Sequence, residues 1–207
     1  MDPDAVEIRV LGCLIEKQRT TPDAYPLSLN SLRLACNQTT NRDPVVVYEE
    51  PEIRAALERL SNRGWVRLAS GAGSRALKYR HLFDGALSLS DAEISLLAVL
   101  MLRGPQTVGE LKQRSERLHL FGSIAEVMQR LDALAGRELV KQLERRPGQK
   151  EERWAQLLGG DGDAAPAAPT AQSEPAHDDR LGEIEERLAR LERLFEELEA
   201  RLAPSPP

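Results

Sequence analysis

The chain has 207 residues, of which 41% are hydrophobic, 29% charged and 4% aromatic, and its formal net charge is −5. That length allows one or two domains with a sizeable hydrophobic core. An acidic total argues against a basic protein that coats nucleic acid, but residues 1–84 and residues 85–158 each carry +1, whereas residues 159–207 carry −7. The acidity therefore belongs to the C-terminal stretch and does not exclude DNA binding by the rest.

The sequence has no feature of a membrane-spanning or exported protein. The longest apolar run, from Ile94 to Leu102, is too short to cross a bilayer and predicts a buried helix instead. Residues 1–4 are acidic and lack the basic and apolar regions of a signal peptide. We therefore expect a cytoplasmic protein with no membrane partner.

No pattern of an enzyme or of a metal site is present in the sequence. Two cysteines, Cys13 and Cys36, offer neither a disulfide framework nor metal-ligand spacing, and their apolar surroundings predict buried structural thiols. The histidines His81, His119 and His177 belong to no nucleophile, metal or acid–base motif. We expect no catalytic activity, no cofactor and no small-molecule ligand.

The first half of the chain is predicted to form three helices followed by a β-hairpin. Apolar residues recur at helical spacing as far as residue 62, after which the period becomes that of strands. Pro51 suits a first helical turn, and Gly64 suits a helix end. The expected elements are a first helix with Val6, Leu11, Leu14 and Ile15, a short helix at Leu29–Cys36 capped by Ser28 or Asn30, a third helix at Glu50–Asn62, and strands at Trp65–Leu68 and Leu77–Arg80.

A long loop separates the second and third of these helices. It contains Arg42, followed by the turn signal Asp43-Pro44. Arg42 is able to contact phosphate, but a salt bridge that fastens the loop is the favoured role.

The second half of the chain repeats the order of the first. Residues 53–60 and 127–134 have coinciding apolar positions at an offset of 74, which indicates an ancient duplication. Capping boxes are predicted for Ser90 with Glu93 and for Thr107 with Glu110. The expected elements are a helix with Ile94, Leu97, Ala98 and Met101, helices at Val108–Arg114 and Ser123–Gly136, and strands at Leu139–Leu143 and Arg153–Leu157.

Three helices followed by a hairpin are typical of the winged helix-turn-helix domain. The predicted fold is mainly α with small β-hairpin wings, in two winged-helix domains at residues 1–84 and 85–158. Residues 159–179 lack Val, Leu, Ile and aromatic residues, which predicts a disordered linker. Residues 180–203 are predicted to form a coiled-coil helix.

A winged helix offers its third helix to the major groove of double-stranded DNA and its wing to the phosphates. On the third helix of domain 1, Glu49, Glu50, Glu52 and Glu58 favour a plain solvated face instead, because they repel phosphate. In domain 2 the wing is a stronger candidate for DNA contact than the third helix. The sequence favours phosphate contact and packing between domains equally as the role of this wing. The candidate DNA-binding residues are Arg54, Arg59, Asn62, Arg63, Arg75, Lys78 and Arg80 in domain 1, and Arg145, Arg146 and Lys150 in domain 2.

The C-terminal segment carries an apolar heptad repeat, which predicts self-association. Glutamates at the e positions and arginines at the g positions favour a parallel dimer over an antiparallel one. A helix that packs on its own domains or on another partner is the alternative. The candidate dimerisation residues are Leu181, Ile184, Leu188, Leu191, Phe195, Leu198 and Leu202.

Several segments of the chain also resemble the YceH-like family of bacterial proteins. The resemblance rests on residues 11–17, 20–30 and 35–45 in the first half, and on residues 102–107 and 146–151 in the second. It implies a bacterial tandem winged-helix protein over about residues 5–158. The family has no assigned reaction or ligand, so the resemblance implies no functional residues.

Two functions remain open from the sequence. The first is a DNA-binding, transcription-regulator-like protein that uses the third helix and wing of domain 1 and the wing of domain 2. The alternative is a winged-helix scaffold for protein–protein interaction, similar in plan to segregation and condensation protein B. Fold alone does not decide between them.

Overall fold

The computed structural model describes residues 2–69, 77–145, 149 and 151–159. In the first half, three helices precede a hairpin, as the sequence predicted. These elements are α1 (Ala5–Thr20), a 3-10 turn at Pro22–Ala24, β1 (Leu27–Ser28), α2 (Leu29–Cys36), α3 (Glu50–Asn62), β2 (Val66–Leu68) and β3 (Lys78–His81). The predicted linker and coiled-coil helix lie outside the described residues.

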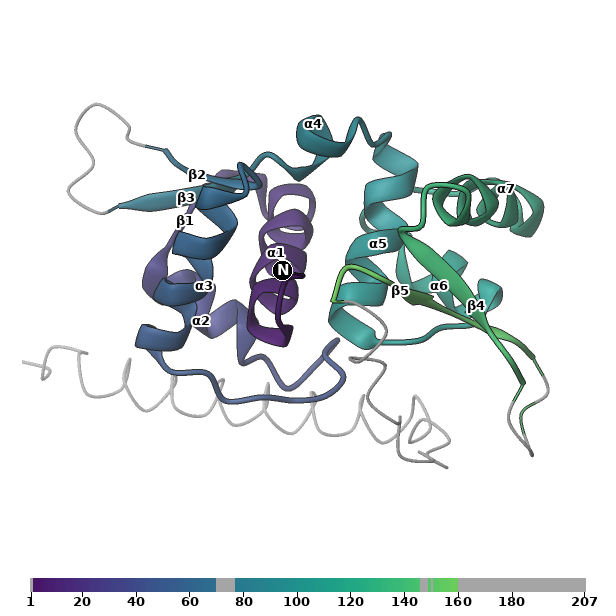
Figure 1. Cartoon of the computed structure of the whole chain (residues 1–207), viewed down its shortest axis with the longest axis horizontal. Helices are drawn as coiled ribbons and strands as arrows, with labels where there is room; N and C mark the ends of the chain where they lie inside the picture. Colours follow the sequence, from purple (N-terminus) through teal and green to yellow (C-terminus); the bar gives the residue numbers. More distant parts are fainter. Residues whose placement is uncertain (1, 70–76, 146–148, 150, 160–207) are drawn as a thin grey trace, which may run out of the picture. The chain divides into compact units, whose positions relative to one another are not determined.

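The second half repeats this order after a short connecting helix, α4 (Phe83–Leu87), that the sequence did not predict. The described chain is therefore mainly helical with small antiparallel sheets (Figure 1). The remaining elements are α5 (Asp91–Arg103), α6 (Val108–Arg114), α7 (Ile124–Ala135), β4 (Val140–Leu143) and β5 (Arg153–Gln156).

Local capping explains why the helices begin and end at these residues. The capping boxes of Ser90 with Glu93 and of Thr107 with Glu110 are both present, which confirms those predictions. Ser28 caps α2 by accepting a hydrogen bond from the backbone N–H of Ser31. After α3 the chain turns at Gly64, whose φ of +75° suits a residue without a Cβ.

The two sheets have related patterns of pairing. In the first half the strand order is β1-β3-β2, and all pairs are antiparallel. In the second half β4 pairs with β5, and an isolated bridge joins Gln106 to Trp154. Gln106 immediately precedes the N-cap of α6, just as β1 contains the N-cap of α2. The bridge is therefore the counterpart of β1 in the second half.

The two halves share one hydrophobic core. Helices α1 and α5 lie side by side at its centre (Figure 1), and most of the residues buried between them are apolar. An ion pair between Arg19 of α1 and Asp91 of α5 closes one end of this contact. Gly12 brings the two backbones together, because a Cβ at this position would lie 3.0 Å from Leu102 Cγ and 3.1 Å from Met101 Cβ. None of the helices in the described ranges is long and apolar enough to cross a membrane.

The loop between α2 and α3 is fastened by Arg42. Its side chain is fully buried and forms a salt bridge with Glu16 of α1, with 2.6 Å between Arg42 Nη2 and Glu16 Oε2. The same guanidinium donates to the carbonyl oxygens of Ala35 and Asn41 and to the side chain of Gln38. The predicted loop salt bridge is thus confirmed.

Candidate nucleic-acid interface

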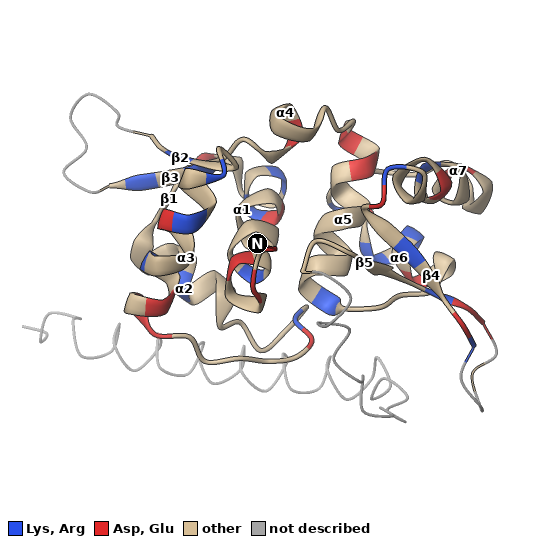
Figure 2. Cartoon of the chain, in the orientation of Figure 1, with Lys and Arg blue, Asp and Glu red and all other residues tan. Residues whose placement is uncertain are grey.

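The hairpin of the first half separates charged from apolar side chains. Arg67 and Arg80 are directly paired across β2 and β3, so both side chains lie on one face of the hairpin. Lys78 shares that face, since it lies two residues before Arg80 on the same strand. We call Arg67, Lys78 and Arg80 the basic face (Figure 2).

The basic face is not neutralised. Within the ranges that the structure describes, neither Arg67 nor Arg80 has an ion-pair partner, and both are exposed. Like charges directly opposite one another on paired strands destabilise a sheet. An anion that binds between the two guanidinium groups would relieve this repulsion. Arg67 was not among the residues singled out from the sequence, because its position opposite Arg80 depends on the register of the hairpin.

The two arginines of α3 and its C-cap residue, Arg63, are arranged differently, since acidic side chains hold all three of them. Arg54 forms an ion pair with Glu50 one turn earlier, with 2.6 Å between Arg54 Nη2 and Glu50 Oε1. Arg59 and Arg63 both reach back to Glu7 of α1. The third helix of the first half is thus electrostatically compensated, in contrast to its hairpin.

Glu7 is the centre of this compensation. It is 2% exposed and accepts from Arg59 Nε at 3.0 Å and from Arg63 Nε at 3.3 Å. Arg59 Nη2 also donates to Asp4 at 2.5 Å, and the hydrogen bond to Glu7 raises the pKa of Arg59. The guanidinium of Arg63 lies over the ring of Trp65, 5.5 Å from its centroid. Reading DNA bases with Arg59 or Arg63 would require these contacts to break.

A shallow groove separates α3 from the apolar face of the hairpin. Its volume is about 200 Å³, and Leu68, one of the residues that line it, is 48% exposed. Asn62, the remaining candidate of α3, is exposed at the end of the helix. The residues that line the groove are Arg54, Leu57, Glu58, Ser61, Val66, Leu68 and Tyr79.

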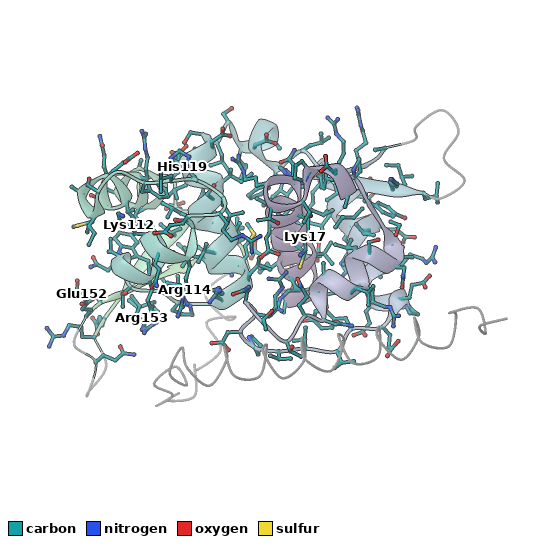
Figure 3. All side chains as sticks on the ribbon, turned by 180° about the vertical axis from the view of Figure 1, so that it is seen from behind. Lys17, Lys112, Arg114, His119, Glu152 and Arg153 are labelled. Carbon is teal, nitrogen blue, oxygen red and sulfur yellow. The ribbon has the colours of Figure 1, made fainter. Side chains whose placement is uncertain are left out.

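In the second half, some of the basic residues near the hairpin form ion pairs within the protein. Arg153 of β5 and Arg114 of α6 both form ion pairs with Glu110, and Figure 3 shows the two arginines close together. Arg153 also donates to the carbonyl oxygen of Pro105 at 2.8 Å. Arg145 is exposed just beyond β4. The candidates Arg75, Arg146 and Lys150 lie outside the described residues.

The outer face of α7 is apolar rather than basic. Ile124 and Met128 lie one turn apart on this helix and are 51% and 48% exposed. Leu120, in the loop that precedes the helix, is 75% exposed. The exposed side chains of α7 include Asp132 but no Lys or Arg. This helix does not offer the positive charge that DNA attracts.

Comparison with known proteins shows that this chain has many bacterial relatives. The family model described as "Protein of unknown function, DUF480" matches residues 4–149. A "UPF0502 protein" of Geotalea uraniireducens is 49% identical over 189 residues, covering 90% of this chain and 85% of the relative. Similar proteins of Serratia proteamaculans and Solibacter usitatus are 44% and 47% identical, covering 94% of this chain and 94% and 95% of theirs. The resemblance to the YceH-like proteins is thereby confirmed, and the chain belongs to the DUF480 family of uncharacterised bacterial proteins.

Proposed function

We propose that this protein binds double-stranded DNA through the basic face of its first hairpin, as a transcription-regulator-like protein. One observation carries the proposal: Arg67 and Arg80 are paired across the strands, exposed and without an ion-pair partner in the described part of the chain. Lys78 extends the same face along β3. Exposed arginine side chains without a carboxylate partner are able to bind the phosphates of a duplex.

We infer that each half is a winged helix-turn-helix unit. Support comes from the order of elements, in which a short strand or bridge precedes the second helix and a hairpin follows the third. In this fold the hairpin is the wing, and wings contact the DNA backbone while the third helix approaches the major groove. The basic face therefore lies on the element from which phosphate contacts are expected.

The charge distribution favours phosphate contact over base reading in the first half. Arg54 and Arg59 of α3 and its C-cap residue Arg63 are already paired with carboxylates. Arg67 and Arg80 of the hairpin have no such partner in the described part of the chain. Phosphate contacts position a protein on DNA but carry no sequence information directly. We therefore expect modest affinity, weak sequence preference and a steep dependence on salt.

Fluorescence anisotropy with a mixed-sequence duplex tests the proposal. Binding by the full chain should weaken as salt rises, and the double variant Arg67→Gln/Arg80→Gln should reduce the slope of log affinity against log salt by about 2. Arg54→Gln is the matched control, because it also removes an exposed arginine but one that is paired with Glu50. It should leave the slope unchanged.

Two outcomes would contradict DNA binding by the hairpin. No binding at low salt would remove the DNA-binding proposal altogether. Binding that is reduced by Arg54→Gln but not by Arg67→Gln/Arg80→Gln would move the contact to α3.

The second candidate function is a protein-interaction scaffold, and the apolar outer face of α7 favours it. Ile124, Met128 and the neighbouring Leu120 expose apolar surface where a DNA-reading helix would need basic side chains. In-cell crosslinking followed by mass spectrometry should recover a partner with the wild type and lose it with Ile124→Ser/Met128→Ser. The matched control is Gln129→Ser on the same helix, which should retain the partner.

The heptad repeat of residues 180–203 adds a third element to the proposal. Because each copy is expected to bind DNA modestly, joining two copies through this segment would raise the effective concentration of the second basic face. The proposed dimer therefore supplies affinity that a single chain lacks.

A further inference from the structure

Strand β2 has one free edge. It is the outer strand in the order β1-β3-β2 (Figure 1), and within the described ranges no strand pairs with its other side. The N–H group of Ala69 donates to the carbonyl oxygen of Lys78 at 2.8 Å, so Ala69 bonds toward β3. Because inward and outward groups alternate along a strand, the N–H and C=O groups of Val66 and Leu68 point away from β3.

The outward groups of β2 are available for further pairing. In the part of the chain that the structure describes, no backbone group from outside the hairpin is bonded to Val66 or Leu68. Leu68 is 48% exposed, so an extended segment is able to reach its backbone. Unpaired strand edges are templates onto which another chain adds as a strand. The edge of β2 therefore offers main-chain hydrogen bonds to an added strand.

The residues of this edge also line the groove between α3 and the hairpin. Val66 and Leu68 form one wall of the groove, and Leu57 lies on the helix side. A strand added beside β2 places every second side chain on the face of Val66 and Leu68, and so against the groove. Glu58 is exposed on the helix wall, whereas Arg54 on the same wall is already paired within its own helix. The charge of Glu58 opposes an acidic side chain there and favours an apolar one.

The remaining side chains of an added strand would meet the basic face. Arg67 lies on that face opposite Arg80, and neither has an ion-pair partner within the ranges that the structure describes. A carboxylate on the free side of Arg67 would form a charge-assisted contact and offset the repulsion between the two arginines. A second copy of β2 would not, because Arg67 would lie opposite its own counterpart in the most fully paired antiparallel register. The charges therefore favour an acidic partner.

We propose that the free edge of β2 binds an extended, acidic segment of a partner protein by strand addition. Main-chain hydrogen bonds to Val66 and Leu68 hold the segment, and its apolar side chains at alternate positions enter the groove. Asp or Glu at the positions between them contacts Arg67. This interaction goes beyond the proposed DNA binding and does not depend on it.

Selection of random nonapeptides displayed on phage tests the proposal, with the full chain as the target. The enriched sequences should alternate apolar with acidic residues. One enriched peptide, synthesised with a fluorescent label, is then the probe for anisotropy measurements in the absence of DNA. Its binding should slow amide hydrogen exchange at residues 66–68, where new main-chain hydrogen bonds form.

Substitutions at the edge separate main-chain pairing from charge. Leu68→Pro should weaken binding of the labelled peptide about tenfold, because it removes an outward N–H group and leaves the bonds to β3 in place. Gln142→Pro is the matched control, since Gln142 has the same outward position on β4, an edge strand of the second hairpin. It should leave the affinity unchanged. Arg67→Gln should also weaken binding about tenfold and reduce its dependence on salt.

Several results would overturn strand addition at this edge. These are the failure of any sequence to enrich, the enrichment of sequences without the alternation, and binding that leaves exchange at residues 66–68 unchanged. If Leu68→Pro turned a dimer of the full chain into single chains in sedimentation, the edge would pair with a second copy instead. Circular dichroism checks that each variant is folded. If Leu68→Pro does not fold, unchanged affinity in Arg67→Gln contradicts the proposal by itself.

Discussion

Gly12 of α1 lies directly against Leu102 of α5, so that a Cβ on Gly12 would lie 3.0 Å from two atoms of the leucine side chain. This is closer than carbon atoms approach in a relaxed core, where optimal separations are about 3.5–4.0 Å. The first helices of the two halves therefore pack as closely as they do because one of them has no side chain at this point.

Gly12→Leu should separate α1 from α5 and lower the free energy of unfolding by about 1–3 kcal/mol, because overpacking forces backbone shifts. Urea unfolding followed by circular dichroism measures the change. Gly109→Leu is the matched control, since the nearest atom to a Cβ at the exposed Gly109 is Thr107 Oγ1 at 3.9 Å. It should be neutral or slightly stabilising, because leucine favours helix more than glycine does. Equal losses in both variants would contradict the close approach.

Arg42→Met should be among the more destabilising substitutions in the chain, lowering the free energy of unfolding by about 3–5 kcal/mol. The methionine would leave the partly buried Glu16 with only the more distant Lys17, 3.9 Å away, and would leave the carbonyl oxygens of Ala35 and Asn41 without their donor. Arg33→Met removes a half-exposed arginine whose carboxylate partner, Glu49, lies 4.0 Å away. This control should cost less than about 1 kcal/mol.

Stability should fall in mild acid because of His81. Burial lowers the pKa of this histidine to about 4, from an ordinary value near 6.5. Between these values the unfolded chain binds the proton and the folded chain does not, so the stabilising contribution is complete above pH 6.5 and is lost as the pH falls toward 4. The expected loss between pH 7 and pH 5 is about 2 kcal/mol.

Urea unfolding of wild type and His81→Gln at both pH values isolates this effect. In the wild type, His81 Nε2 lies 2.6 Å from Gln18 Oε1. The glutamine of the variant keeps a polar group at this position but has no group that titrates. The stability of the variant should fall by about 2 kcal/mol less than that of the wild type between the two pH values. The same fall in both proteins would assign the acid sensitivity to other groups.

Self-association through residues 180–203 remains a prediction from the heptad repeat. Sedimentation equilibrium of the full chain should give twice the molar mass of one chain, whereas a version that ends at Leu158 should give the mass of a single chain. Leu188→Asp/Leu191→Asp in the full chain should also give a single-chain mass, because charges at core positions of a coiled coil oppose pairing. Identical masses for the full and shortened chains would exclude the dimer.

Sequence patterns predicted the helices closely because the determinants are local. The ends of α2, α3 and α6 fall where the sequence placed them, since capping residues and apolar spacing act within a few residues. Strand β1 and the bridge at Gln106 were missed, because two residues have no detectable period. β1 forms only through pairing with β3, and the bridge of Gln106 only through Trp154 of β5.

The candidate site was predictable only in part. The alternation along β3 placed Lys78 and Arg80 on one face, but Arg67 joins them through the register of the hairpin, which the sequence did not determine. The ion pairs of Arg59 and Arg63 with Glu7 connect residues more than 50 positions apart. No local pattern predicts such a contact, since it arises from the packing of α3 on α1.

The close packing at Gly12 also bears on whether either half of the described chain is stable alone. Each half covers an apolar helix face of the other. Removing either half would expose that face to water, at a free-energy cost of about 25 cal/mol for each Å² of apolar surface. The two halves are therefore expected to fold as one unit, and neither half is expected to be stable alone.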